Sequence, residues 1–429
     1  MWTLLLAAGR FLNLDPRLWA YALGLGFLGA AGYVTFILWR DLLPSLPLWG
    51  GVAAAIVVVM DWHLTWAAVS GMETTLFIFL SVLLVAVSVE GRPPWVAGLV
   101  AGLLFVTRPE GILLGGLCLV YGVTSEVRLG SLAGAVLGRR ERAAQALRFS
   151  AAFGVGLLLL IVPYLAFNAA TSGTLLPNTY YAKVAVYGRD GLGGLLVFLG
   201  EAFAMLSLGP LALMWPGLVA AVVLMARKRR DLWLIAAWPI VLLAVYAWRL
   251  PTIYQHGRYL MPALPFLILL GWWGLAEIRC SISMRLLATV YPVAVALLTA
   301  FAWVYGASIY ASDVRFIETF QVATARWLRD NTPPGALVAT HDIGAIGYYS
   351  GRRVLDSAGL VTPQVLSLLN DQPRLLAYLK EQRVAYVAQF PKWYPLISRN
   401  LADREVFRVH DDKVTAAGGD DFVVYRTGW

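Results

Sequence analysis

The chain has 429 residues, of which 59% are hydrophobic and only 14% are charged, and its mean hydropathy is +0.70. Soluble domains are nearer to half apolar and a quarter charged, so this composition excludes a water-soluble globular protein and predicts a polytopic membrane protein. The net charge of +9 does not indicate nucleic-acid binding, because residues 307–429 carry 14 basic and 13 acidic side chains and the excess lies in the apolar part.

Apolar runs near spanning length follow one another along the first 306 residues. They cover residues 18–39, 46–60, 74–90, 95–107, 110–125, 150–167, 206–226, 232–250, 259–276 and 285–306. The first is preceded by Asp15 and Pro16, a pair typical of a helix start. We therefore expect a mainly α fold, a bundle of about ten spanning helices, as a domain of residues 1–306.

Small residues inside these runs are expected to let helices pack closely. They are Gly24, Gly26, Gly29, Gly32 and the pair Gly98 and Gly102.

Basic residues mark alternate connections between the runs. They are Arg40, Arg92, Arg128, Arg139, Arg140, Arg142, Arg148, Arg227, Lys228, Arg229, Arg230, Arg279 and Arg285. The positive-inside rule makes these connections cytoplasmic, in a multi-pass protein of the cytoplasmic (plasma) membrane. The other connections and all that follows residue 306 are then extracytoplasmic. An even number of spans also places Met1 outside, which is uncommon and favours a natural chain that has another span upstream.

Residues 307–429 are expected to form a small extracytoplasmic α/β domain. Phe316–Asp330 is predicted to be an amphipathic helix, and residues 363–382 are predicted to be helical. The predicted strands are Ala336–Thr340, Arg353–Asp356, Val384–Ala388, Arg404–Val409 and Phe422–Tyr425. Strands that alternate with helices favour an α/β layer.

The connections predicted to be outside carry unusual polar groups, which are costly at a membrane boundary unless they are paired or face a wet cavity. They include Glu73, Arg108, Glu110, Asn178, Tyr180, Tyr181, Lys183, His256, Arg258 and Tyr259. Because these groups lie at the ends of several helices on one side, they predict a cavity open to the outside. A guanidinium binds phosphate oxygens with two hydrogen bonds, so Arg108 and Arg258 are candidates to contact an anionic head group.

Structural readings compete with each of these assignments. Arg108 and Glu110 could simply pair with each other, and Glu73 could cap the helix that begins at residue 74. Tyr180 and Tyr181 could be interfacial belt residues, whereas Asn178 and Lys183 in the same octet favour a sugar or phosphate contact. As the alternative to capping, Glu73 could bind an acceptor hydroxyl or a metal ion, or act as a base.

His341 and Asp342 follow a predicted strand and enter a turn that contains glycine, a common place for ligand contacts. The competing reading, slightly favoured, is that Asp342 caps the next helix. The spacing of Gly344 and Gly347 does not match a dinucleotide motif, so no nucleotide site is predicted.

The polar motifs, taken in order, resemble the GT-C superfamily of membrane glycosyltransferases. These motifs are Ser70–Thr74, Thr107–Gly111, Leu176–Lys183, His256–Tyr259 and His341–Gly344. The likeness is closest to the arabinofuranosyltransferases of bacterial cell walls and their uncharacterised relatives, and it covers nearly the whole chain.

The resemblance implies a polyprenyl-phosphate sugar donor, a glycan or glycolipid acceptor, and a lipid tail held among the helices. It also implies a catalytic acid in the first outer loop. Met1 to Leu5 resemble the end of that loop, so we expect the catalytic acid upstream of Met1, with Glu73 as the candidate within the chain. No metal ligand is assigned, and a divalent cofactor is left open.

The function expected from the sequence is glycosyl transfer with inversion at the outer face of the membrane. A transporter or flippase for a lipid-linked sugar would use a similar basic cavity. A third reading is a truncated, non-catalytic paralogue that only binds such lipids.

Overall fold

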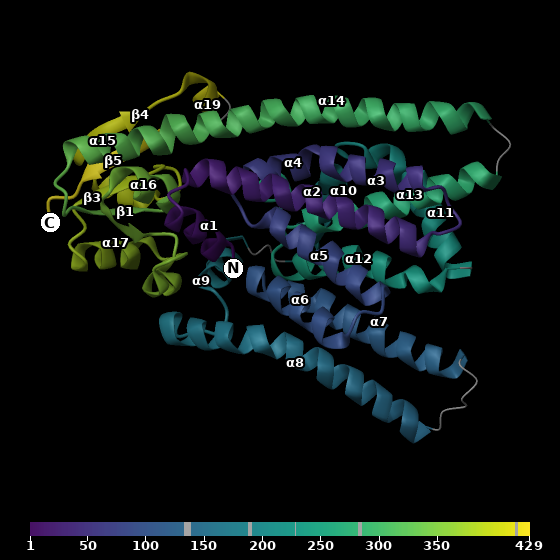
Figure 1. The fold of residues 1–429 in the computed structure, drawn as a ribbon. Helices are drawn as coiled ribbons and strands as arrows, with labels where there is room; N and C mark the ends of the chain where they lie inside the picture. Colours follow the sequence, from purple (N-terminus) through teal and green to yellow (C-terminus); the bar gives the residue numbers. More distant parts are fainter. Residues whose placement is uncertain (133–138, 188–190, 228, 282–284, 417–418) are drawn as a thin grey trace. The chain divides into compact units, whose positions relative to one another are not determined.

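The computed structural model describes residues 1–132, 139–187, 191–227, 229–281, 285–416 and 419–429 (Figure 1). Lys228 lies outside these residues, and the side chains of Arg128, Arg139, Arg230, Arg279 and Arg285 are not described.

The chain divides into two compact units. Residues 1–167 and 189–307 form one, which we call the membrane unit, and residues 168–188 and 308–429 form the other, which we call the sheet unit. The sheet unit thus includes residues 168–188, which we expected in the first domain.

Long apolar helices build the membrane unit. They are α1 (Trp2–Phe11), α2 (Pro16–Leu42), α3 (Leu48–Met60), α4 (Trp62–Val69), α5 (Thr74–Val89), α6 (Pro94–Thr107), α7 (Gly111–Leu132), α8 (Arg139–Ser172), α10 (Gly191–Ser207), α11 (Leu211–Arg227), α12 (Trp233–Arg249), α13 (Leu264–Ser281) and α14 (Arg285–Ile317). The short 3₁₀ turns η1 (Arg230–Leu232) and η2 (Met261–Ala263) precede α12 and α13. The last residues of α8 and α14 belong to the sheet unit. Each of the predicted apolar runs coincides largely with one of these helices.

Several of these helices can cross a membrane, so the chain is a multi-pass membrane protein. Among the described residues, four helices are long and apolar enough to cross, or up to six if each of two bent helix pairs counts as one span. Four further apolar helices are 10–17 residues long, among them α5, α6 and α12. The count of ten spans stays a prediction.

Helix starts and close contacts in the membrane unit follow from particular residues. The carboxylate of Asp15 accepts hydrogen bonds from the backbone N–H groups of Arg17 and Leu18, as predicted for the start of α2. A Cβ at Gly24 would lie 1.9 Å from the carbonyl oxygen of Ala68, and one at Gly98 would lie 2.0 Å from that of Phe153. These glycines permit close helix packing. The same prediction was wrong for Gly26 and Gly29, where a Cβ would meet nothing within 4 Å.

Helices occupy three segments that the sequence did not mark as helical. Residues 62–69, predicted as a loop, form α4, whose start is capped by the Asp61 carboxylate. Residues 178–187 form α9 (Asn178–Tyr187), and residues 191–207 form α10. Both α4 and α10 are apolar helices shorter than a span, so a search for runs of spanning length passes over them.

The sheet unit is a five-stranded mixed sheet in the order β2-β1-β3-β5-β4. Its strands are β1 (Leu337–Thr340), β2 (Arg353–Asp356), β3 (Tyr386–Gln389), β4 (Glu405–Val409) and β5 (Phe422–Arg426). β1 pairs in parallel with β2 and β3, whereas β5 runs antiparallel to β3 and β4. The strands lie at or within two residues of the predicted positions.

Helices and short turns cover both faces of the sheet. The helices are α15 (Ala323–Asn331), α16 (Ile343–Ser350), α17 (Gln372–Glu381), α18 (Pro395–Asn400) and α19 (Asp412–Ala416), and the turns are η4 (Pro363–Leu368) and η5 (Ala402–Arg404) (Figure 1). One core contains Phe320, Leu328, Val338, Ile346 and Val424, and the other contains Ala339, Val365, Leu375, Ile397 and Val423. Alternate residues of β1 and β5 therefore point to opposite faces of the sheet, each covered by helices.

Two helices of the sheet unit differ from the prediction only in detail. Residues 343–350 form α16, the helix that the capping interpretation placed after Asp342, and Ile346 packs into the core on one face of it. The helix predicted at Phe316–Asp330 is confirmed, but it is continuous with α14, which runs through the π-helical segment η3 (Glu318–Val322) into α15.

Candidate functional site

The sequence-predicted site residues fall into both compact units. Glu73, Arg108, Glu110, His256, Arg258 and Tyr259 lie in the membrane unit. Asn178, Tyr180, Tyr181, Lys183, His341 and Asp342 lie in the sheet unit.

Arg108 and Glu110 form a buried ion pair at the junction of α6 and α7. The Nε atom of Arg108 lies 2.7 Å from Oε1 of Glu110, and the two side chains are 7% and 15% exposed. Tyr246 of α12 joins them, since its hydroxyl accepts from Nη2 of Arg108 at 2.9 Å and donates to Oε1 of Glu110 at 2.5 Å. The pairing that we weighed as a structural reading is therefore present. It leaves Nη1 of Arg108 buried without a hydrogen-bond partner.

Tyr259 connects this ion pair to a second arginine. Its ring stacks on the ring of Tyr246 with centroids 5.0 Å apart. The guanidinium carbon of Arg108 lies 5.1 Å from the centroid of Tyr259, and that of Arg258 lies 5.0 Å from it. One buried aromatic ring therefore holds two cationic groups, each by a cation–π contact.

Arg258 is surrounded by neutral groups. Its Nη1 atom donates to Oε1 of Gln255 at 2.7 Å and also contacts the sulfur of Met72, and its guanidinium lies over the ring of Tyr254. Nε of Arg258 is buried without a hydrogen-bond partner, and none of the described carboxylates forms an ion pair with this side chain. A partly buried cation with neutral partners and a spare N–H group is the arrangement expected where an anion binds.

The turn before Arg258 has an unusual backbone. Gln255, His256 and Gly257 all have positive φ angles, of 48°, 56° and 76°. Such angles cost energy for residues other than glycine and persist where the surroundings enforce them. His256 is held by edge contacts with Trp62 and Trp66 of α4, with ring centroids 5.8 and 4.8 Å away. The aromatic contacts of α4 thus help to fix the turn that presents Arg258.

Glu73 lies at the start of α5, but its side chain makes no capping hydrogen bond. The capping role that we weighed for it is therefore not observed. Its charge acts on Arg108, so the carboxylate lies within electrostatic range of the buried ion pair.

The sequence did not single out Asp61 or the buried state of His63. Both side chains are 2% exposed, and Nδ1 of His63 lies 3.2 Å from Oδ1 of Asp61. Nε2 of His63 is buried without a hydrogen-bond partner. The Asp-x-His spacing is too common to indicate such a pair without the structure.

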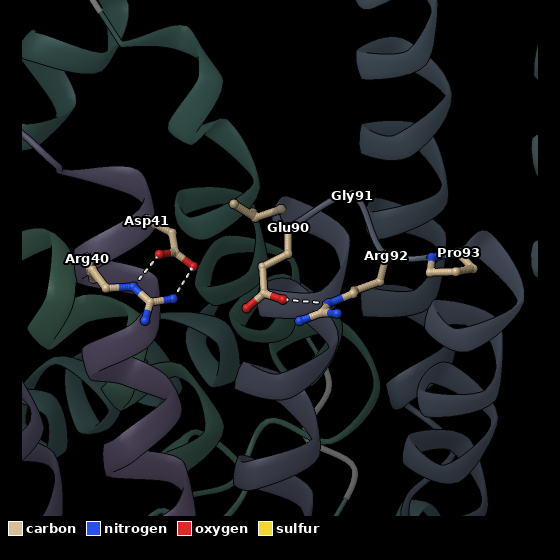
Figure 2. Close-up of a pocket in the computed structure, with 7 residues that line it drawn as sticks. Arg40, Asp41, Glu90, Gly91, Arg92 and Pro93 are labelled. Carbon is tan, nitrogen blue, oxygen red and sulfur yellow. Dashed lines mark hydrogen bonds and ion pairs between the residues drawn. The ribbon is translucent and has the colours of Figure 1, made fainter.

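A pocket at the other end of α5 contains none of the predicted site residues. Figure 2 shows Arg40 facing Asp41 and Arg92 facing Glu90. Nε of Arg40 lies 2.6 Å from Oδ1 of Asp41, and Nε of Arg92 lies 2.7 Å from Oε2 of Glu90. Each arginine at this pocket thus has its own carboxylate, unlike Arg258.

The predicted residues of α9 are only partly brought together. Asn178 is buried and its Oδ1 atom has no hydrogen-bond partner, whereas Tyr181 is 37% exposed and packs edge-on against Tyr180. Residues 176–183, expected as a loop, therefore include the first turns of a helix.

His341 and Asp342 follow β1 in the sheet unit. Nε2 of His341 lies 3.3 Å from Oδ2 of Asp342, and the same oxygen accepts a hydrogen bond from Nε2 of Gln321 at 3.0 Å. Asp342 occupies the position before α16 but makes no capping hydrogen bond, so the capping reading that we slightly favoured was wrong. Burial alone would raise the pKa of Asp342, but the imidazole of His341, 3.3 Å away, and the hydrogen bond from Gln321 outweigh burial and lower this pKa.

No three His, Cys, Asp or Glu side chains converge as a metal site would require, within the part of the chain that the structure describes.

Known proteins resemble this chain in a part of its sequence and in its fold. A family described as a domain of unknown function (DUF8728) matches residues 307–425. None of the curated proteins matches the chain.

Solved structures resemble nearly the whole chain. The structure of ArnT from Cupriavidus metallidurans in the apo state has a TM-score of 0.62 at 15% identity, over 99% of this chain and 86% of that one. ArnT bound to undecaprenyl phosphate gives a TM-score of 0.59 at 16% identity, over 99% of this chain and 87% of that one. The oligosaccharyltransferase of Archaeoglobus fulgidus, in complex with Zn and sulfate, gives a TM-score of 0.54 at 15% identity, over 90% of this chain and 58% of that one. At these identities the likeness shows the fold, and the chain has the GT-C fold that its motifs predicted.

Proposed function

We propose that this chain is a glycosyltransferase that moves a sugar from a polyprenyl-phosphate donor to a glycan or glycolipid acceptor of the cell envelope, at the outer face of the cytoplasmic membrane. The observation that carries the proposal is the pair of guanidinium groups on the ring of Tyr259, each with a buried N–H group that lacks a partner. The GT-C fold supports the same reading, since ArnT has been solved with undecaprenyl phosphate bound.

The chemistry of a lipid phosphate fits this pair of arginines. Arg108 is paired with Glu110, whereas Arg258 has only neutral partners, so no direct ion pair compensates the charge of Arg258. A partly buried cation without an ion-pair partner is costly, and phosphate oxygens would accept hydrogen bonds from the spare N–H donors of both side chains. The donor would therefore bind with its phosphate at Tyr259 and its lipid tail among the apolar helices.

The proposed transfer breaks one bond and forms one. An acceptor hydroxyl oxygen attacks the anomeric carbon, and the bond between that carbon and the phosphate oxygen breaks, with its electron pair leaving on the lipid phosphate. Arg258 and Arg108 stabilise the charge that develops there. Glu73 is the candidate within the chain to take the proton of the attacking hydroxyl, because a carboxylate can act as a general base and this one lies within electrostatic range of Arg108.

Binding of undecaprenyl phosphate to the full chain in detergent tests the anion site. Arg258→Gln removes the charge that has no carboxylate partner, and hydrogen bonds to charged groups are worth about 1.5–3 kcal/mol, so we expect roughly ten- to hundredfold weaker binding. Arg249→Gln is the matched control, since Arg249 lies at the exposed end of α12 over Trp248. Equal binding by the wild type and Arg258→Gln would contradict the assignment.

A flippase for a lipid-linked sugar would also need a basic site for the lipid phosphate. Vesicles that contain the chain separate the two functions. Transfer of labelled sugar to an acceptor supports the enzyme, whereas movement of the lipid across the bilayer without transfer supports the flippase.

A further inference from the structure

The connections of the sheet unit give it a topological switch point at the carboxyl ends of its parallel strands, and we call this place the crevice. β1 is followed by α16 on one face of the sheet and then by β2, on one side of β1. β3 lies on the other side of β1 and is followed by α18, whose Ile397 packs on the other face. The chain segments after β1 and β3 therefore diverge. In open α/β sheets, ligands bind at such a switch point, outside the carboxyl ends of the strands.

Aromatic side chains line this place. β1 ends at Thr340 and is followed by His341, and β3 ends at Gln389 and is followed by Phe390, Trp393 and Tyr394. The ring of His341 lies 4.4 Å from that of Trp393, 5.7 Å from that of Phe390 and 5.8 Å from that of Tyr394. His341 is buried, whereas Trp393 is 58% exposed. The indole of Trp393 is thus exposed at the surface beside the buried ring of His341, where the flat apolar face of a ligand can stack on it.

Polar groups with spare hydrogen-bonding capacity lie beside the rings. Asp342 accepts from Gln321 and contacts His341, and its side chain is still 36% exposed. Gln321 is 3% exposed, and its Oε1 atom is buried without a partner, as is Nδ1 of His341. Gln321 comes from the π-helical segment η3, a kind of irregularity that is frequent at functional sites. Buried polar atoms without partners need an explanation, and a bound ligand is one.

The charge of the crevice selects the class of ligand. Asp342 has a lowered pKa, so its carboxylate is ionised near neutral pH and repels anions. The nearby Lys392 is engaged by the backbone carbonyl of Gly419. An exposed indole beside a carboxylate and an amide suits a ligand with apolar C–H faces and many neutral hydroxyl groups.

We propose that the crevice formed by His341, Asp342, Gln321, Trp393 and Tyr394 binds a neutral saccharide. The sugar ring stacks on Trp393, and its hydroxyl groups donate to Asp342 and to Oε1 of Gln321. We take this saccharide to be part of the acceptor glycan, and that step rests on the proposed function. The binding of a neutral saccharide does not rest on it.

The test is saturation-transfer NMR on the full chain in detergent. The probes are methyl glycosides and disaccharides of galactose, arabinose, mannose and glucose, with inorganic phosphate as the charged comparison. We expect at least one saccharide to bind the wild type and phosphate not to compete. Trp393→Ala and the isosteric Asp342→Asn should each weaken binding roughly tenfold or more, given the worth of an aromatic face or a charge-assisted hydrogen bond. Tyr348→Ala is the matched control, since Tyr348 is an equally exposed aromatic residue on α16.

Four results would overturn the proposal: no saccharide binding, binding equal in the wild type and Trp393→Ala, equal loss in Tyr348→Ala, or displacement by phosphate. The transferase activity of the wild type separates this proposal from the proposed function. Saccharide binding that depends on Trp393, in a wild-type chain that transfers no sugar, would keep the crevice and reject the enzyme. Transfer without such binding would do the reverse.

Discussion

Arg108 and Arg258 lie over the same ring, that of Tyr259, with their guanidinium carbons 5.1 and 5.0 Å from its centroid. Two like charges share one aromatic group, but only Arg108 is paired with a carboxylate. Tyr259 is 5% exposed, so both cation–π contacts are sheltered from water. The proposed lipid phosphate would supply the negative charge that Arg258 lacks among its direct partners.

Tyr259→Leu should therefore damage the anion site more than Tyr259→Phe. Leucine removes the ring that holds both arginines, and we expect roughly tenfold weaker binding of undecaprenyl phosphate, since two partly buried cation–π contacts of about 1 kcal/mol or more are lost. Phenylalanine keeps the ring and loses the long contact between the hydroxyl of Tyr259 and Nη2 of Arg258, which are 3.4 Å apart. Equal binding by the two variants would show that the ring does not organise the site.

Glu110→Gln should destabilise the membrane unit strongly. It leaves the buried Arg108 without its carboxylate, and breaking a buried pair costs about 3–5 kcal/mol. Glu90→Gln is the matched control, because its partner Arg92 is 61% exposed and such surface pairs are worth about 0–1 kcal/mol (Figure 2). Thermal unfolding in detergent should show a clear fall in Tm for the first variant only, and similar values for both would contradict the role of burial.

Gly98→Ala should weaken helix packing, whereas Gly154→Ala should not. A Cβ at Gly98 would lie 2.0 Å from the backbone oxygen of Phe153 in α8, and a helix backbone atom cannot rotate away as a side chain can. A Cβ at Gly154 would meet nothing within 4 Å. Overpacking of this kind costs about 1–3 kcal/mol, while alanine in place of a helical glycine with open space around it is neutral or favourable. The Tm values of the two variants in detergent test this expectation, and an unchanged Tm for Gly98→Ala would be inconsistent with the contact.

The stability of the sheet unit should depend on Asp342 in acid. Its pKa in the folded chain is lowered from the ordinary value of 3.8, so its contribution is present above 3.8 and is lost as the pH falls through the lower folded value. Asp342→Asn should therefore unfold with less change in Tm than the wild type as the pH is lowered from 5 toward 3, an interval of about two units around the carboxylate pKa. Asp330, Asp411 and Asp421 titrate in the same range in both proteins, so the difference between the two curves isolates Asp342. Parallel curves would contradict the pairing with His341 and Gln321.

The sequence was sufficient for features set by local pattern. Runs of apolar residues located the long helices, and the alternating pattern placed strands such as β2 (Arg353–Asp356) at their observed bounds. The motifs around Arg108 and Arg258 were predicted to belong to one site from their predicted side of the membrane and from the GT-C resemblance, and the ring of Tyr259 contacts both arginines.

Other features depend on contacts between distant residues. The ring of Tyr246 belongs to an apolar run and gives no sign that its hydroxyl joins Arg108 to Glu110, more than 130 positions away in the sequence. Likewise, Asp342 stands where a helix cap is expected, and only the approach of Gln321 from η3 shows its other partner. The short helices α4 and α9 were missed because their apolar residues are fewer than a span requires.

Sugar transfer by the full chain in vesicles is the most direct test of the central claim. The donors are polyprenyl phosphates that carry labelled arabinofuranose, mannose or glucose, and the compared proteins are the wild type, Arg258→Gln and Arg249→Gln. We predict that the wild type and Arg249→Gln transfer label from one donor to a glycan acceptor and that Arg258→Gln loses roughly a hundredfold in rate, as expected when a charge that stabilises the leaving phosphate is removed. Equal rates for Arg258→Gln and the wild type, or lipid movement with no transfer by any of the three, would contradict the account.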